Sequence, residues 1–207
     1  MNKWHFISAV CAFIIFCTLW KTYETPFIQA FDQGAFDLLY GLEFFIVFHY
    51  IGETWFIFTV LIILLLIIWI RLEDEKLMLF NVLTTVFGFA LYQVLKHIIE
   101  RSLPEFVIIP TTYSFPSGHA THGCLYLVTI AYVSNRMIIS KKTSRIIWTI
   151  AIILSLLIGL SRISEGHHYA SDVLAGWMLG YSWFTLCVWW YESDYPSSNL
   201  IGRKNEI

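Results

Sequence analysis

Charged residues are scarce in this sequence. Lys, Arg, Asp and Glu make up 14% of its 207 residues, whereas soluble domains average roughly 25%. Hydrophobic residues make up 57%, lie in long runs and give a mean hydropathy of +0.66. This composition indicates a membrane protein and argues against a large soluble domain. Basic residues form no run typical of a nucleic-acid surface, so we expect no nucleic-acid partner.

Cysteine is also scarce, and its placement argues against metal binding. The four cysteines lie inside apolar runs and form no C-x-x-C pair: Cys11, Cys17, Cys124 and Cys187. Carboxylates and histidines likewise show no metal-ligand spacing along the chain, so we expect no metal and no cofactor. No small-x-small cleavage site follows the first apolar run, which is expected to be a retained membrane helix.

Six segments have the length of a membrane-spanning helix, which takes roughly 17–25 residues. Five are strongly apolar, and the sixth contains His119, His122 and Asn135 and is expected to be a buried span. The expected fold is one all-α, polytopic domain over residues 1–207. Its predicted spans are about 4–20, 54–70, 76–97, 119–138, 145–162 and 172–191.

The segment 25–50 has a different pattern. Apolar residues such as Ile28, Phe31 and Ala35 recur in steps of three and four, while Asp32 and Glu43 belong to the opposite face. This helical period with a polar side predicts a helix lying in the membrane interface. A helix packed on the other helices of the bundle is an equally good interpretation.

The distribution of basic residues predicts the orientation. Nine Lys and Arg residues fall on the side that holds both termini, and four fall on the other side. The positive-inside rule therefore places the termini in the cytoplasm. The loops 21–53, 98–118 and 163–171 then share the extracytoplasmic side of a plasma-membrane protein, and every candidate site residue lies at that side.

Pro116-Ser117-Gly118-His119 precedes the fourth span. Free backbone N–H groups at the start of a helix bind anions, and Gly118 permits close backbone approach. His119 would lie in the first turn, where it could act as a general acid beside a bound phosphate. Without the histidine, this motif would more simply be a helix cap.

His168 and Asp172 are spaced i, i+4 and would share one face if their segment is helical. A carboxylate on one ring nitrogen leaves the other free as a nucleophile. His167 is the rival nucleophile, and Asp172 alone would more simply be a helix cap.

Lys96 and Arg162 close two spans on the same side and could hold phosphate oxygens. The alternative for each is a side chain that extends to the membrane interface. These two cations would supply the charge that many phosphatases take from metal ions, so a metal-free mechanism is expected.

These residues carry a resemblance to the type-2 phosphatidic acid phosphatase superfamily. The family motif P-S-G-H matches at 116–119, and S-R-x5-H-x3-D matches fully from Ser161 to Asp172. The first motif, K-x6-R-P, matches only in part, because Leu103 stands at the arginine position between Lys96 and Pro104. Arg101 is a possible substitute. Within the superfamily, the chain is similar to bacterial phosphatidylglycerophosphate phosphatase B-type proteins.

The resemblance implies a metal-independent lipid phosphatase that works through a phosphohistidine. His168 would attack phosphorus, oriented by Asp172, and His119 would protonate the leaving oxygen. The phosphate-binding residues would be Lys96, Ser117, Gly118 and Arg162, with Arg101 as a further candidate. Expected substrates are lipid phosphates such as undecaprenyl pyrophosphate or phosphatidylglycerol phosphate. A lipid phosphotransferase, or an inactive lipid-binding or transport protein, is the alternative.

Overall fold

The computed structural model describes residues 3–105, 112–138 and 140–193, and in this part of the chain every regular element is helical. The residues 194–207, which were predicted to lie on the cytoplasmic side, are outside the described part. The elements are α1 (Lys3–Thr22), α2 (Pro26–Leu39), α3 (Glu43–Ile46), η1 (Val47–Gly52), α4 (Thr54–Arg71), α5 (Glu75–Val82), η2 (Leu83–Phe87), α6 (Gly88–Ile99), α7 (Gly118–Met137), α8 (Lys141–Ser164) and α9 (Ala170–Ser193).

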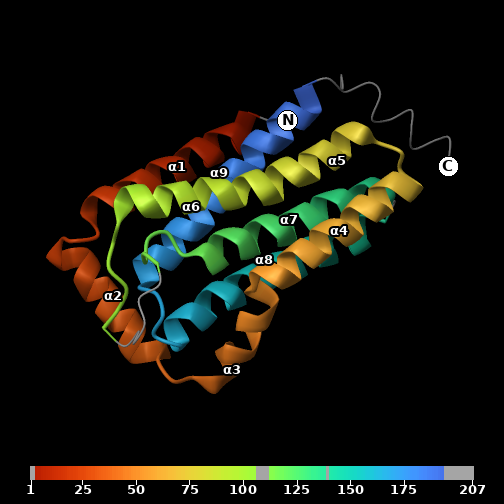
Figure 1. The fold of residues 1–207 in the computed structure, drawn as a ribbon. Coiled ribbons are helices and arrows are strands. Elements are labelled where there is room, and N and C mark those ends of the chain that lie inside the picture. Colours follow the sequence, from red (N-terminus) through yellow and green to blue (C-terminus); the bar gives the residue numbers. More distant parts are fainter. Residues whose placement is uncertain (1–2, 106–111, 139, 194–207) are drawn as a thin grey trace.

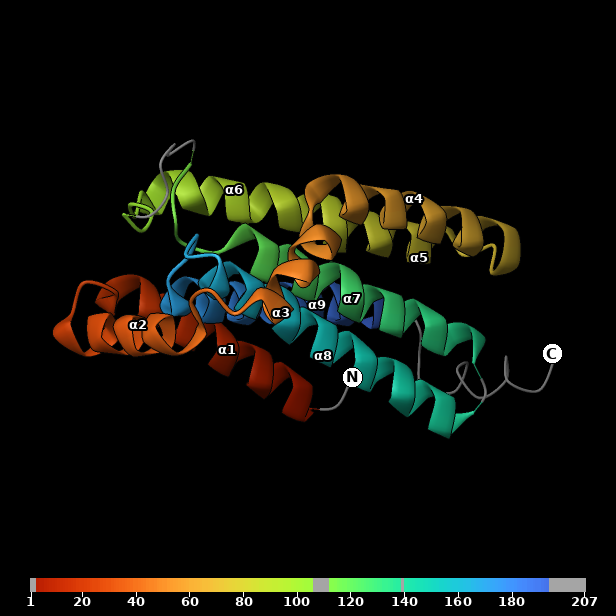
Figure 2. The ribbon, with the colours of Figure 1, turned by 90° about the horizontal axis from the view of Figure 1, so that it is seen from below.

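The long helices run side by side along one axis (Figure 1). Turned by 90°, the bundle shows α4, α5 and α6 on one side of α7, with α1 and α8 on the other (Figure 2). The most extensive packing joins α7 to α8, α1 to α9, and α7 to α9. α7 and α9 therefore form the centre of the molecule, and both carry predicted site residues at one end.

The predicted multi-span fold is confirmed. Five helical stretches are long and apolar enough to cross a membrane: His5–Thr22, Thr54–Arg71, Glu75–Ile99, Lys141–Ser164 and Ala170–Ser193. α7 is less apolar, but twelve of its twenty residues are buried against neighbouring helices. Because protein rather than lipid covers most of α7, it can carry polar groups at the depth of the other spans.

The segment 25–50 is not the single helix that the sequence predicted. α2 ends at Leu39, and the axes of α2 and the following α3–η1 unit differ by 100°. The chain turns at Gly41, whose φ of +77° is a conformation that glycine adopts without steric cost. Asp32 on α2 is buried. The break thus packs α2 on the bundle and brings η1 over the ends of α7 and α8.

The bundle has two unlike ends. The N-terminal end of α1 and the C-terminal end of α9 lie at one end, with the α4–α5 and α7–α8 connections (Figure 1). The α2–α3–η1 segment, the connection from α6 to α7 and the 165–169 turn lie at the other end. The second group corresponds to the three loops that the sequence placed together.

Candidate active site

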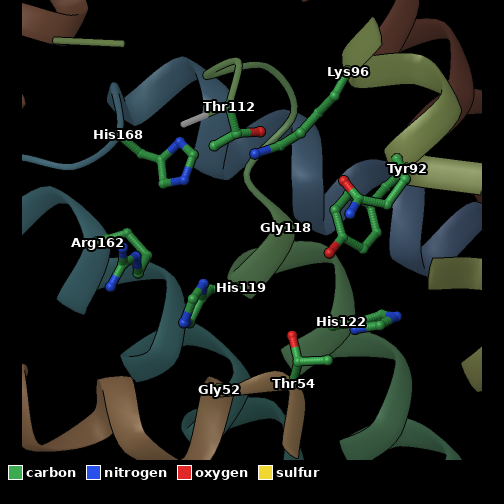
Figure 3. Close-up of a pocket in the computed structure, with 11 residues that line it drawn as sticks. Gly52, Thr54, Tyr92, Lys96, Thr112, Gly118, His119, His122, Arg162 and His168 are labelled. Atoms are coloured by element: carbon green, nitrogen blue, oxygen red, sulfur yellow. The ribbon is translucent and has the colours of Figure 1, made fainter. Parts of the chain in front are cut away.

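A cavity of about 270 Å³ lies at the second end of the bundle (Figure 3). Five of the eight predicted site residues line it: Lys96, Gly118, His119, Arg162 and His168. They come from the end of α6, the start of α7, the end of α8 and the turn before α9. The fold therefore brings side chains from four separate parts of the chain to one space.

His168 lies in the turn just before α9, not on the helix face that its spacing suggested. Its Nδ1 is still 3.6 Å from Oδ2 of Asp172 and 3.5 Å from the Ser114 hydroxyl. Burial lowers the pKa of His168 from 6.5 to about 4, although the hydrogen bond to Asp172 opposes this shift. The ring is therefore neutral near pH 7, as a nucleophile requires.

Asp172 is fully buried and has several donors around it. As the third residue of α9, it accepts a hydrogen bond from the Tyr169 backbone N–H at 3.0 Å, which also caps the helix. The Ser114 hydroxyl donates to the same carboxylate oxygen. The same carboxylate oxygen of Asp172 accepts the Tyr169 N–H and faces the His168 ring. Capping the helix and orienting His168 are therefore compatible roles.

Arg101 does not line the cavity. Its NH1 donates to Asp172 at 2.6 Å and to the Ser171 hydroxyl at 2.7 Å, and its NH2 donates to Asp32 at 2.8 Å. The charges of these carboxylates outweigh burial and raise the pKa of Arg101. This placement does not support the predicted phosphate contact. It puts Arg101 behind Asp172, where it bridges two buried carboxylates.

The start of α7 faces the cavity. Ser117 is fully buried and acts as the N-cap, accepting from the Ala120 backbone N–H at 3.5 Å. Its own N–H donates to the Asp172 carbonyl at 3.1 Å, so this N–H is engaged within the fold, and the phosphate contact of Ser117 stays a prediction. Gly118 lies on Tyr92, since an added Cβ would be 2.8 Å from that ring. The Nε2 atom of His119 is buried and makes no hydrogen bond within the described residues.

Arg162 is held by side chains from two loops. It donates to Glu165 and to Nδ1 of His49, and its NH2 lies 2.7 Å from Nδ1 of His167. Burial would raise the pKa of Glu165, but the hydrogen bond to His49 and the charge of Arg162 hold it below its ordinary value. His167 therefore contacts Arg162 rather than Asp172, and this favours His168 as the nucleophile.

Lys96 and His122 also line the cavity. Lys96 is only 5% exposed in the last turn of α6, so it does not reach out to bulk water as an interfacial lysine would. His122, one turn after His119, donates from Nε2 to the Thr85 carbonyl at 3.2 Å. Its ring packs against Phe89 and Tyr92, as expected of a polar residue of the bundle core.

Sequence reasoning missed the site role of four polar residues that contact predicted site residues: Asp32, His49, Glu53 and Ser114. Glu53 lies 2.5 Å from His49 Nε2 and 3.6 Å from His119 Nε2. Together, His49, Glu53 and His119 offer ligand atoms close enough to hold a metal ion, a cluster that linear spacing did not reveal. The only signal in the sequence was the i, i+4 spacing of His49 and Glu53.

Comparisons with known proteins agree with the geometry. Phosphatidylglycerophosphatase B of Bacillus subtilis (strain 168) is 35% identical over 99 residues, which cover 46% of this chain and 49% of that protein. An undecaprenyl-diphosphatase of Sulfolobus acidocaldarius is 35% identical over 91 residues, which cover 44% of this chain and 39% of that protein. The matched region thus spans half or less of each curated relative.

A crystal structure has the same fold. It is described as the first transmembrane PAP2 type phosphatidylglycerolphosphate phosphatase from Bacillus subtilis. It superimposes with a TM-score of 0.82 over 92% of this chain and 98% of that chain, at 24% identity. The family model described as PAP2 superfamily matches residues 76–195, which is more than half of the chain and contains all three motif regions. The resemblance is confirmed, and the chain belongs to the PAP2 superfamily.

Proposed function

We propose that this protein is a membrane-embedded lipid phosphatase that transfers a phosphoryl group to His168 and then to water. The observation that carries the proposal is the shared cavity: the two candidate catalytic imidazoles, His119 and His168, line one space with the cationic side chains of Lys96 and Arg162. Fixed positive charge is what a transferring phosphoryl group requires, and here it comes from the side chains themselves.

The contacts support a role for each group. Asp172 lies next to Nδ1 of His168, so Nε2 is the nitrogen left to attack phosphorus. As the N–P bond forms, the ester or anhydride bond breaks, and His119 donates a proton to the leaving oxygen. Water, deprotonated by His119, then attacks the phosphohistidine and releases inorganic phosphate. Lys96 and Arg162 hold the phosphoryl oxygens through both steps.

The surroundings of the cavity suit an amphiphilic substrate. Gly52 and Thr54 form one wall, and large apolar residues near them in sequence are exposed: Val47 (59%), Tyr50 (62%) and Trp55 (64%). Lipid tails could lie along these side chains while the phosphate enters between them. The names of the relatives favour undecaprenyl pyrophosphate and phosphatidylglycerol phosphate as substrates.

The proposal includes a location. Arg71, Lys76, Arg136 and Lys141 lie in or beside connections at the end of the bundle opposite the cavity (Figure 1). The positive-inside rule makes that end cytoplasmic and the cavity extracytoplasmic, in a plasma membrane. A site on that side would act on lipid carriers whose phosphate is exposed at the outer leaflet.

The test is phosphate release from a panel of lipid phosphates by purified protein in detergent. Wild type should hydrolyse at least one lipid, and vanadate should inhibit it because vanadate mimics the phosphoryl transition state. His168→Ala should show no turnover, whereas His97→Ala, an exposed histidine on α6 outside the cavity, should retain it. Loss of turnover in His167→Ala with full turnover in His168→Ala would refute the assigned nucleophile. Transfer of phosphate to an added alcohol would identify a phosphotransferase.

A further inference from the structure

Two side chains outside the assigned catalytic groups, His49 and Glu53, form a cluster with His119. His49 lies within η1, Glu53 follows η1, and His119 is the second residue of α7. Glu53 Oε1 lies 2.5 Å from His49 Nε2 and 3.6 Å from His119 Nε2. One ligand atom from each of His49, Glu53 and His119 lies within 4.8 Å of the others. Their side chains are 22%, 31% and 21% exposed, so an ion from solution can reach them.

Two further contacts point to a ligand at this cluster. Nε2 of His119 is buried without a hydrogen-bond partner in the described part of the chain, although buried polar atoms are nearly always satisfied. On the other side, Nδ1 of His49 lies 3.3 Å from a Glu165 carboxylate oxygen. A metal-ligating histidine usually donates its other ring N–H to a carboxylate, and Glu165 is placed to accept it. Arg162 also contacts Nδ1 of His49, so this contact must be given up when an ion binds Nε2.

We propose that His49, Glu53 and His119 form a site for a divalent transition-metal ion, with Zn²⁺ as the ion that fits best. Two imidazoles and one carboxylate are a recurrent zinc ligand set, which leaves a fourth position for water or a phosphate oxygen. Mg²⁺ and Ca²⁺ prefer six or more oxygen ligands, and this cluster offers mainly nitrogen.

Charge near the cluster sets limits on the affinity. Arg162 contacts His49 on Nδ1 and repels a cation, and Lys96 lines the same cavity. Glu53 and Glu165 offset these two positive charges, one as a ligand and one behind His49. These opposing charges predict a site of limited affinity. It should bind Zn²⁺ when the ion is added and release it to a chelator, and it should not be permanently occupied.

The site has a consequence for activity, and this step rests on the proposed function. A metal ion on Nε2 of His119 takes the lone pair that a proton needs, so His119 could no longer act as acid and base. Zn²⁺ would therefore inhibit the phosphatase reversibly, without taking part in its chemistry.

Binding is tested first, without reference to activity. Purified protein with a histidine-free affinity tag is titrated with Co²⁺, whose visible spectrum reports nitrogen and oxygen ligation, and Zn²⁺ is then used to displace it. We expect one ion per chain. Glu53→Gln and His49→Ala should each weaken binding by at least about tenfold. Glu43→Gln on α3 and His97→Ala on α6, both exposed and outside the cluster, are the matched controls. Absence of binding, or equal affinity in all four variants, would overturn the proposal.

Inhibition is measured next, by phosphate release from the best lipid substrate with and without Zn²⁺. Zn²⁺ should lower turnover over the concentration range in which it displaces Co²⁺, and a chelator should restore it. If the metal binds as expected but no lipid is hydrolysed in metal-free buffer, the proposed function fails and the metal site stands. If turnover is normal and Zn²⁺ neither binds nor inhibits, the metal site is refuted and the phosphatase stands.

Discussion

At the scale of single residues, Asp172 shows how one carboxylate can serve folding and chemistry at once. It caps α9 through the Tyr169 N–H and also faces the His168 imidazole. Arg101 holds it from behind, and Arg101 is itself held by Asp32 from α2. Because each member fixes the next, the position of the nucleophile depends on a residue of a different helix that never contacts the cavity.

Arg101→Lys is expected to separate positioning from phosphate binding. Lysine keeps the positive charge between two buried carboxylates, so folding is retained, but one ammonium cannot reproduce a guanidinium bridge to both. A small displacement of His168 should lower kcat by about 10–100-fold. The vanadate inhibition constant should stay near the wild-type value, because Arg101 does not line the cavity.

The comparison variant is Lys96→Gln, which removes a cation from the cavity wall and should weaken vanadate inhibition. If Arg101→Lys weakens vanadate inhibition as strongly as Lys96→Gln, then Arg101 contacts the phosphate after all. In that case the partial first motif would function as the family pattern does, with its arginine two positions earlier.

The sequence was sufficient to predict the cavity-lining residues His119, Arg162 and His168, because each stands at the end of an apolar run and the topology brings those ends together. The partners His49, Glu53 and Ser114 were not predictable. Their contacts depend on how irregular segments turn, and neither periodicity nor hydropathy describes such turns. Leu103 was a visible departure from the motif, but only the fold shows that Arg101 turns toward Asp32.

At the scale of elements, the geometry of the site depends on how closely α9 approaches α7. An added Cβ at Gly176 would lie 2.7 Å from the Ser117 carbonyl oxygen, and one at Gly180 would lie 2.9 Å from the Thr121 carbonyl oxygen. Glycines four residues apart on one helix face permit such close packing in membranes. The same contact holds the Ser117 N–H on the Asp172 carbonyl, and thereby joins the starts of both helices.

Gly176→Ala is therefore expected to push the start of α7 away from α9. Overpacking of this kind typically costs about 1–3 kcal/mol, so the variant should unfold at lower temperature in detergent. Its kcat should fall as well, because His119 moves relative to His168. Gly34→Ala on α2 is the control, since a Cβ there meets nothing within 4 Å. Wild-type stability and turnover in Gly176→Ala would show that the close approach is dispensable.

The segment 25–50 shows that the sequence predicted a helix but not the position of its end. Its helical period was correctly recognised, but the period says nothing about where a helix stops when the following residues are also apolar. The break falls at Gly41, and the equally weighted alternative of packing on the bundle describes α2 better, since Asp32 is buried against α9 and Arg101.

At the scale of the whole molecule, the bundle separates charge and chemistry between its ends. The six long helical stretches were predictable within a few residues, because membrane thickness fixes their length. The proposed direction of the bundle in the membrane rests on basic residues at the end opposite the cavity. Since the proposed substrates expose phosphate at one leaflet, orientation decides which lipid pool the enzyme can use.

Orientation can be measured by labelling single cysteines in intact cells. In a background without the four native cysteines, Ser102→Cys lies beside the cavity end and Lys142→Cys lies at the start of α8, and both positions are exposed. A membrane-impermeant maleimide should label Ser102→Cys directly and Lys142→Cys only after permeabilisation. Both variants should retain phosphatase activity, which shows that the labelled fold is native. The reverse labelling pattern would place the cavity in the cytoplasm, so the enzyme would then act on lipids of the inner leaflet and the basic residues would face outward.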